Sequence, residues 1–333
     1  MRGLTVLFWI AGLAVIAVLV YLVDFAEMAH SVAVIGWGFV PVLSVRVIVL
    51  FVDSQSWRSL LPKTTQSTWR MAAYQRWVGE SVSTMLPFAA IGGELARIRV
   101  ILLSGIAGPL AVASIIMDGV VALVSQFLFL CLGITLFART AAHVESLNQS
   151  ILIGGVALLI AVVSVWMLVR GGVLGRLATM LKENLAGDRV AWLARAMGSV
   201  DGWIAAITDR PIVVARSIAW RLLGWLLGAS EIWLILYLLG QPISISDALI
   251  LDAVTAAVRT AFFFVPGGLA VQEGAMILVG ATLGVDADAM LVAAVIKRSR
   301  EIIFSIPGLL AWEIFESKSL RQSVTAARSV TDV

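Results

Sequence analysis

Charged residues and cysteine are both scarce in this 333-residue sequence. Only 14% of the residues are charged, whereas 60% are hydrophobic, and the mean hydropathy is +1.00. An ordinary soluble domain is about a quarter charged, so a water-soluble fold would not bury this much apolar surface. Cys131 is the single cysteine, which excludes an intramolecular disulfide and a metal site built from several cysteines. The composition predicts a protein folded in lipid.

Catalytic motifs are also missing. The two histidines, His30 and His143, lie near predicted loops, and there is no H-E-x-x-H motif, no P-loop and no nucleophile elbow. We therefore expect no catalytic residue set, no resident cofactor and no metal ion. Glutamate and arginine alone can carry out acid–base chemistry, so a membrane enzyme stays open as an alternative.

Six apolar runs are long enough to cross a bilayer, since about twenty helical residues span roughly 30 Å of hydrocarbon. They are Leu4–Val23, Val32–Val52, Ile106–Phe137, Ile151–Val169, Ile212–Leu239 and Asp288–Phe315. Two further apolar stretches, 69–104 and 247–283, are interrupted by Pro and Gly, so each yields two half-helices too short to cross alone. We predict an all-α polytopic membrane protein with about six transmembrane helices and two re-entrant helical hairpins.

Basic residues are concentrated in alternate connections. One connection carries Arg58, Lys63, Arg70 and Arg76, and the segment 170–210 is also rich in Lys and Arg, whereas the loop 139–150 is weakly charged. The positive-inside rule places both termini, including the tail 316–333, in the cytoplasm, with the protein in the cytoplasmic membrane and 139–150 outside. The same confinement to loops argues against a nucleic-acid partner. Apolar residues at helical spacing in 170–210 predict amphipathic helices lying on the cytoplasmic leaflet.

The two interrupted stretches resemble each other. In each, a Pro stands seven residues before a Glu with a Gly-Gly pair between them: Pro87, Gly92, Gly93 and Glu94 in the first, and Pro266, Gly267, Gly268 and Glu273 in the second. Asp118 and Lys297 each follow the corresponding Glu by twenty-four residues.

This repetition predicts two halves of the same element order. The first, 1–138, holds two spans, the hairpin 69–104 and one span; the second, 151–315, holds two spans joined by 170–210, the hairpin 247–283 and one span. Because each half has an odd number of crossings, the second copy is inverted relative to the first. The alternative is two unrelated Pro kinks.

Charged side chains inside membrane spans are energetically unfavourable, so each needs a partner, a polar cavity or a function. The candidate substrate or ion pathway consists of Glu80, Glu94, Arg97, Asp118, Arg259, Glu273, Lys297, Arg298, Arg300 and Glu301. A structural alternative is that these charges form buried pairs joining helices, for example Asp118 with a base of the last span.

Glu94 and Glu273 are predicted to begin the returning half-helices. A carboxylate there caps free N–H groups, or, if the two hairpin tips meet near the membrane centre, binds a cation, a proton or a headgroup. Lys297 and Glu301 are four residues apart and can pair on one helix face.

Two segments, GESVSTMLPFAAIGGELARI at Gly79–Ile98 and FVPGGLAVQEGA at Phe264–Ala275, resemble signatures of the lysylphosphatidylglycerol synthase transmembrane-region family. The ending Ala293–Glu313 is similar to the branch of hopanoid-biosynthesis-associated membrane proteins. Ala270 departs from the signature, which usually has Gly there. The aminoacyl-transfer domain of the fused synthases is missing, so we do not expect this chain to make lysyl lipid.

The resemblance implies lipid flipping. The expected function is a flippase or transporter that moves a lipid or a polyprenyl- or hopanoid-type amphiphile across the cytoplasmic membrane by alternating access, coupled to protons or another cation. The expected partners are membrane lipids and the transported lipid or lipid-linked molecule, with lipid-biosynthesis enzymes and a homo-oligomer as further candidates. Two alternatives stay open: a membrane-embedded enzyme that modifies lipid headgroups, and a non-transporting partner of a lipid-synthesis complex.

Overall fold

The computed structural model describes residues 25–85, 90–140, 145–172, 175–177, 179–180, 188–261 and 269–331. Within them the chain forms eleven α-helices and one short 3-10 helix, and no strand. The predicted all-α fold is confirmed for this part of the chain. The predicted first span, Leu4–Val23, lies outside the described residues.

Three of the described helices are long and apolar enough to cross a membrane: Met28–Leu60, Gly108–Ala138 and Pro211–Leu238. Each coincides with a predicted span. The first comprises most of α2 (Phe25–Ile35), η1 (Gly36–Gly38) and α3 (Phe39–Leu60), and the other two belong to α6 (Gly108–Thr140) and α10 (Pro211–Leu238). The predicted spans Ile151–Val169 and Asp288–Phe315 lie within α7 (Glu145–Arg170) and α13 (Ala287–Thr331).

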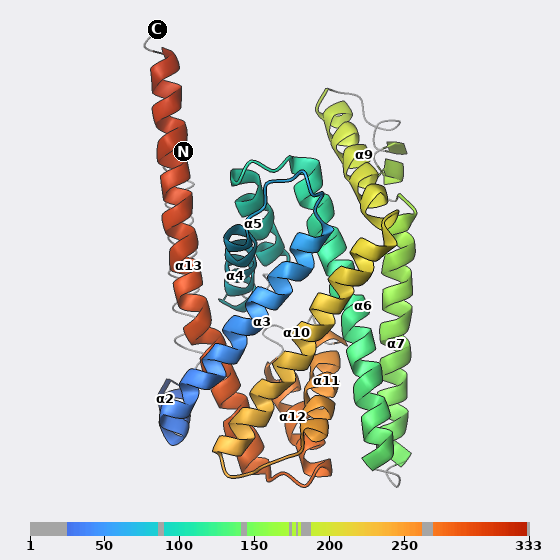
Figure 1. Cartoon of the computed structure of the whole chain (residues 1–333), viewed down its shortest axis with the longest axis vertical. Coiled ribbons are helices and arrows are strands. Elements are labelled where there is room, and N and C mark those ends of the chain that lie inside the picture. Colours follow the sequence, from blue (N-terminus) through green and yellow to red (C-terminus); the bar gives the residue numbers. More distant parts are fainter. Residues whose placement is uncertain are drawn as a thin grey trace.

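The two interrupted stretches each form a pair of short helices. The first pair is α4 (Trp69–Met85) and α5 (Ala90–Leu103), and the second is α11 (Ile245–Ala261) and α12 (Leu269–Thr282). Helices of 17 and 14 residues are about 25 and 21 Å long, shorter than the hydrocarbon layer. The members of each pair pack against each other, and the two pairs lie towards opposite ends of the molecule (Figure 1).

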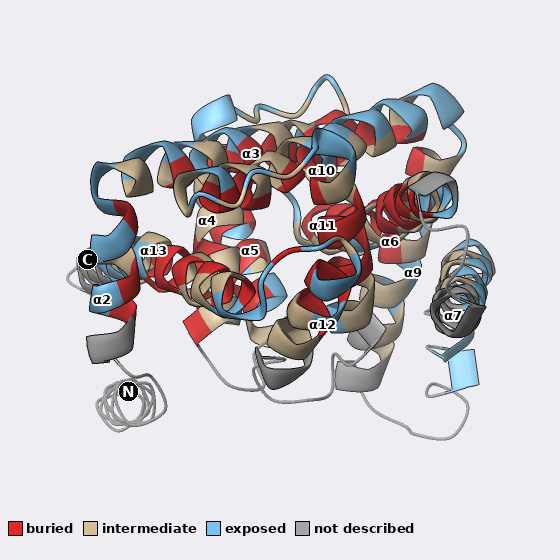
Figure 2. Ribbon diagram, turned by 90° about the horizontal axis from the view of Figure 1, so that it is seen from below, coloured by how far each residue is buried: buried red, intermediate tan, exposed pale blue. Residues whose placement is uncertain are grey.

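The helices α3 and α10 pack together as one layer over the short helices, with α13 on one side and α6 on the other (Figure 2). The largest buried apolar cluster joins α10, α11, α12 and α13, with Leu236, Leu251, Met276 and Met290 at its centre. The short helices therefore pack against long ones, which bury polar side chains such as Arg97 on α5 and Asp252 on α11.

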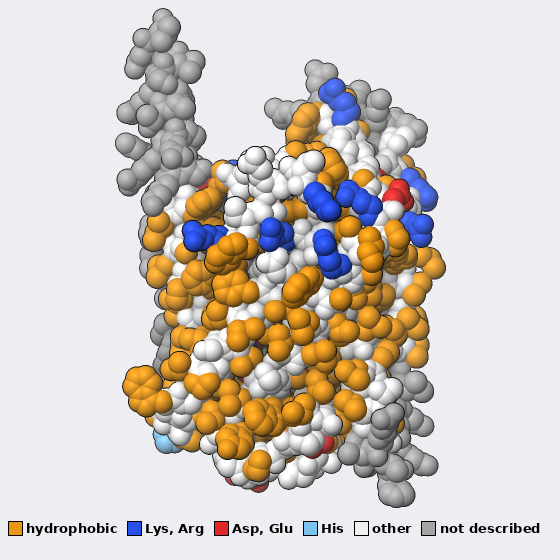
Figure 3. Space-filling model, viewed as in Figure 1, with side chains coloured by type: hydrophobic (Ala, Val, Ile, Leu, Met, Phe, Trp, Pro, Cys, Tyr) orange, Lys and Arg blue, Asp and Glu red, His pale blue; other side chains and the backbone are white. Residues whose placement is uncertain are grey.

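The outer surface is apolar along most of its height (Figure 3). Large side chains such as Ile160 and Met167 on α7 and Leu310 on α13 are 58–66% exposed. An apolar surface this continuous is unfavourable in water and matches lipid. Lys and Arg side chains gather towards the end where α9 (Asp188–Thr208) lies (Figure 3).

The helix α9 differs from the predicted membrane-surface helix of segment 170–210. Val200, Ile204 and Ile207 on its apolar face are buried against α6. This face is therefore covered by protein, because α6 offers an apolar partner.

The structure corrects the prediction for the first Gly-Gly pair. Gly92 and Gly93 lie inside α5, which begins at Ala90, and so they do not break the helix. A Cβ on Gly93 would lie 2.5 Å from the carbonyl oxygen of Gly79 on α4. Small residues here allow α4 and α5 to approach closely, as at other helix contacts in membranes. The other predicted hairpin-tip residues lie outside the described part: Pro87, Pro266, Gly267 and Gly268.

Gly93→Ala is expected to destabilise the protein by about 1–3 kcal/mol, because the new methyl group forces α4 and α5 apart. The matched control is Gly119→Ala in α6, where a Cβ meets no atom within 4 Å. The control should be neutral or slightly stabilising, because alanine favours helix. Thermal unfolding in detergent measures both, and equal stabilities would contradict the close-packing role of Gly93.

Candidate functional site

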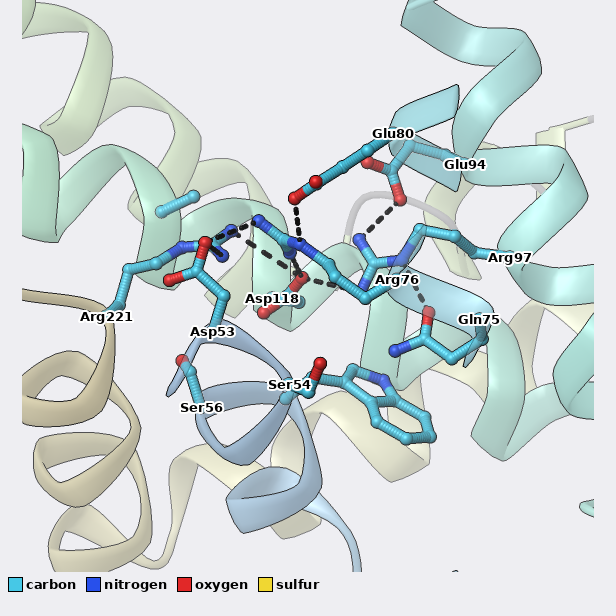
Figure 4. A network of polar contacts seen from close by, with 12 residues as sticks. Asp53, Ser54, Ser56, Gln75, Arg76, Glu80, Glu94, Arg97, Asp118 and Arg221 are labelled. Atoms are coloured by element: carbon cyan, nitrogen blue, oxygen red, sulfur yellow. Dashed lines mark hydrogen bonds and ion pairs between the residues drawn. The ribbon is translucent and has the colours of Figure 1, made fainter. Parts of the chain in front are cut away.

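A network of charged side chains is buried between the helices of the first half, and Asp118 of α6 is at its centre (Figure 4). One carboxylate oxygen, Oδ2, accepts hydrogen bonds from Arg97 Nη2 at 2.7 Å and Arg76 Nη1 at 2.9 Å. Arg221 of α10 places Nη2 at 3.7 Å from the same oxygen. The predicted partner, a base of the last span, is wrong, because α4, α5 and α10 supply the arginines.

Arg76 of α4 connects three carboxylates. Its guanidinium contacts Glu80 at 2.9 Å, Asp118 at 2.9 Å and Asp53 at 3.2 Å, and Glu80 also binds Arg46 of α3. The prediction that counted Arg76 among the bases of a cytoplasmic connection is wrong, since its side chain is 11% exposed. Because α4 begins at Trp69, Arg76 lies two turns inside the helix.

Glu94 is at the edge of this network. Arg97 donates to Glu94 at 2.8 Å through Nη1 and to Gln75 at 2.7 Å through Nε, while the Glu94 side chain remains 49% exposed. The prediction that Glu94 begins the returning helix is wrong, because α5 starts four residues earlier at Ala90. Glu94 therefore acts as an ion-pair partner reachable from outside and not as a helix cap.

We call this network the first charged centre. It contains four arginines and four carboxylates and so is neutral as a whole: Arg46, Arg76, Arg97, Arg221, Asp53, Glu80, Glu94 and Asp118. Arg76, Arg97 and Arg221 each contact two or more carboxylates through different guanidinium nitrogens, so the arginines crosslink the carboxylates of several helices. Removing one member leaves an uncompensated buried charge, which is strongly destabilising.

The second half holds another set of buried ion pairs. Lys297 of α13 donates to Asp252 of α11 at 2.8 Å, and Arg300 donates to Glu231 of α10 at 2.9 Å. Arg300 also lies 3.8 Å from Glu301. The predicted Lys297–Glu301 pair is thus replaced by a pair across two helices, because Asp252 faces Lys297 from α11.

A small pocket opens beside these pairs, between α12 and α13. It is lined by Gln272, Glu273, Met276, Ala294, Arg298 and Glu301 and has room for about one water molecule. Arg259, near the end of α11, is exposed and interacts electrostatically with Glu301. We call this set the second charged centre: Glu231, Asp252, Arg259, Glu273, Lys297, Arg298, Arg300 and Glu301.

Arg46 connects the two centres. It binds Glu80 of the first and interacts electrostatically with Glu231 of the second, and its guanidinium lies 5.9 Å from the ring centre of Phe304 on α13. Glu94 belongs to the first centre and Glu273 to the second, and the hairpin tips lie outside the described residues. Among the described residues no group of three or more His, Cys, Asp or Glu is placed to hold a metal ion.

Residues 9–308 match the family described as the lysylphosphatidylglycerol synthase TM region. The chain belongs to this family. The match covers both charged centres and every described helix from α2 to α12, and it confirms the family resemblance of the two signature segments. Neither a curated protein nor a solved structure matches the chain. With its long apolar helices, this member of the lysylphosphatidylglycerol synthase TM region family is a multi-pass membrane protein.

The structure of this family member places all ten predicted pathway residues in one of the two centres and adds six more: Arg46, Asp53, Arg76, Arg221, Glu231 and Asp252. Three of the six, Arg46, Arg221 and Glu231, are charges inside predicted spans, and Asp252 lies in the predicted hairpin 247–283, which is the same signal that identified the others. Asp53 fell outside the predicted span, which ended at Val52, whereas α3 continues to Leu60. Arg76 was counted with the basic connection although it lies within the predicted hairpin 69–104, and the structure places it in α4.

Proposed function

We propose that this protein transports a lipid or lipid-linked amphiphile across the cytoplasmic membrane by alternating access of two inverted halves. The observation that carries the proposal is the pair of connected charged centres enclosed by helices whose outer surface is apolar. Such centres offer a polar route for a headgroup, while the acyl or prenyl chain stays in the surrounding lipid.

Matching details of the two halves support the inverted repeat. The helices α5 and α12 both have 14 residues, and each is followed by a glycine with positive φ, 85° at Gly105 and 77° at Gly284. In both, the backbone N–H of the residue after this glycine donates a hydrogen bond to the carbonyl oxygen five residues earlier: Ile106 to Ile101 at 3.4 Å, and Val285 to Gly280 at 3.0 Å. This is one and the same Schellman helix ending, found in short helices that lie towards opposite ends of the molecule.

Exchange of ion partners supplies a mechanism for opening. Each buried carboxylate is held by bases from other helices, so the helices can separate only if substrate, water or protons replace those contacts. The pocket at Glu273 and Arg298 is too small for a headgroup in this conformation. Substrate entry therefore needs α12 to move away from α13, with the headgroup replacing part of the Glu273, Arg298 and Glu301 interactions.

The distribution of basic residues supports an orientation. Lys and Arg gather at the end of the molecule where α9 lies, near the connection that carries Arg58, Lys63 and Arg70 (Figure 3). By the positive-inside rule this end would be cytoplasmic, in agreement with the orientation predicted from the loops of the sequence. The pair α4 and α5 then lies nearer the cytoplasmic leaflet and the pair α11 and α12 nearer the outer leaflet.

Reconstitution in vesicles tests the proposal against the enzyme alternative. Purified protein would be given fluorescent phosphatidylglycerol, phosphatidylethanolamine or polyprenyl phosphate, and the recovered lipids would be analysed by mass spectrometry. We expect at least one lipid to change leaflet with its mass unchanged. A changed mass without translocation would instead support headgroup modification, and no change of leaflet for any probe would contradict transport.

A further inference from the structure

The two halves contain an equivalent ion pair with its charges exchanged. Arg76 is the eighth residue of α4, and Asp252 is the eighth residue of α11. Their partners, Asp118 and Lys297, are the eleventh residues of α6 and α13. Arg76 contacts Asp118 at 2.9 Å, and Asp252 contacts Lys297 at 2.8 Å. The same two helix positions are thus joined in both halves, with the base on the short helix in one and on the long helix in the other.

The bases of the two pairs differ in chemistry. A guanidinium keeps its proton in proteins, whereas a buried ammonium can release one. Of all the cations in the two centres, Lys297 alone is not an arginine. Arg76 is held by three carboxylates, while Lys297 forms its ion pair with Asp252, at 2.8 Å. The first pair is therefore permanently charged, and the second can change its protonation.

Because the ion pair is largely buried, the protonation of Lys297 depends on the position of α11. The side chains of Lys297 and Asp252 are 14% and 11% exposed. If α11 moves away from α13, the ammonium loses its carboxylate, and a partly buried charge without a partner is unfavourable by several kcal/mol. Release of the proton from Nζ to water in the opening removes this penalty. When the helices close, Nζ takes a proton from the water on that side and the ion pair forms again.

The helices around this pair carry further charged groups. Three of them, Arg298, Arg300 and Glu301, are on α13 itself, and Arg300 is held by Glu231. The others come from the helices around it: Arg259 on α11, Glu273 on α12, Glu231 on α10, Arg46 on α3, Glu80 on α4 and the exposed His30 on α2. This set contains as many carboxylates as arginines, so the charged surroundings of the pair are balanced.

We propose that Lys297, held by Asp252, is the proton-binding site that couples lipid movement to a proton gradient. This inference rests on the proposed transport function and specifies the coupling ion. Lys297→Arg is the informative variant, because arginine keeps the positive charge and can still bind Asp252 but does not release a proton. The matched control is Lys63→Arg, an exposed lysine between α3 and α4.

The experiment follows fluorescent phosphatidylglycerol and the internal pH together in vesicles of phosphatidylethanolamine and phosphatidylglycerol, with and without an imposed pH gradient. In the wild type and Lys63→Arg we expect the gradient to change the translocation rate and lipid movement to carry protons. Lys297→Arg should move lipid at a rate independent of the gradient and without proton movement. Asp252→Asn, which removes the partner carboxylate, should likewise lose the response to the gradient.

The outcomes separate this inference from the proposed function. Wild-type translocation that ignores the pH gradient, or a Lys297→Arg protein that still responds to it like the wild type, would overturn proton coupling at Lys297 and leave transport standing. Absence of translocation by the wild type would overturn both. If Lys297→Arg does not fold, an Asp252→Asn protein that keeps the full response overturns the site.

Discussion

Asp118→Asn is expected to destabilise the protein by about 3–5 kcal/mol, the usual effect of removing one partner from a buried ion-pair network. Asp118 is fully buried, and its carboxylate contacts Arg76, Arg97 and Arg221. Asparagine has nearly the same shape, so the loss is of charge and not of packing. Three arginines would then share the remaining carboxylates, and the first charged centre would carry a net positive charge away from water.

Denaturant or thermal unfolding in detergent measures this effect, with Glu316→Gln as the matched control. Glu316 pairs with Arg99 at 2.8 Å, but the two side chains are 27% and 44% exposed. Solvent screens such a pair, so its loss should change stability by at most about 1 kcal/mol. Equal losses in the two variants would show that the buried network is not what holds α4, α5, α6 and α10 together.

Glu273→Gln is expected to abolish lipid translocation while leaving the unfolding transition unchanged. Glu273 lines the pocket between α12 and α13 together with Arg298 and Glu301. Glutamine keeps the shape of the side chain and removes its charge. Glu301 would then be the remaining acidic side chain in the pocket lining beside Arg298. The headgroup could no longer replace Glu273 as an interaction partner, so its entry would be blocked.

The control is Glu313→Gln, which neutralises an exposed glutamate farther along α13. Translocation by this variant should match the wild type. A Glu273→Gln protein that is folded and fully active would remove Glu273 from the pathway and weaken the assignment of the pocket as the entry site.

The sequence was sufficient to predict the helical fold. The thickness of the bilayer sets the length of an apolar run that crosses it, and Pro and Gly mark where such a run is interrupted. The repeated Pro-to-Glu spacing also located the two short helix pairs. Helix ends were less predictable: the span assigned to Val32–Val52 continues to Leu60. This error left Asp53 outside the span, although its carboxylate contacts Arg76 and Arg221 in the first charged centre.

The predicted charged residues were found in the centres, but their partners were not predictable. Periodicity within one helix suggested Lys297 with Glu301, four residues apart. The actual partner, Asp252, lies on a helix forty-five residues away in sequence, and its position depends on how α11 packs against α13. Likewise, the Gly-Gly pair was assigned to a chain break, whereas close packing of α4 and α5 is what requires Gly93.

The most direct test of lipid transport is the time course of dithionite bleaching of fluorescent phosphatidylglycerol in vesicles with increasing amounts of purified wild-type protein. We expect lipid of the inner leaflet to become accessible at a rate that rises with the amount of protein and is absent from protein-free vesicles. Bleaching that stops at the outer-leaflet share at every amount of folded protein would contradict the account.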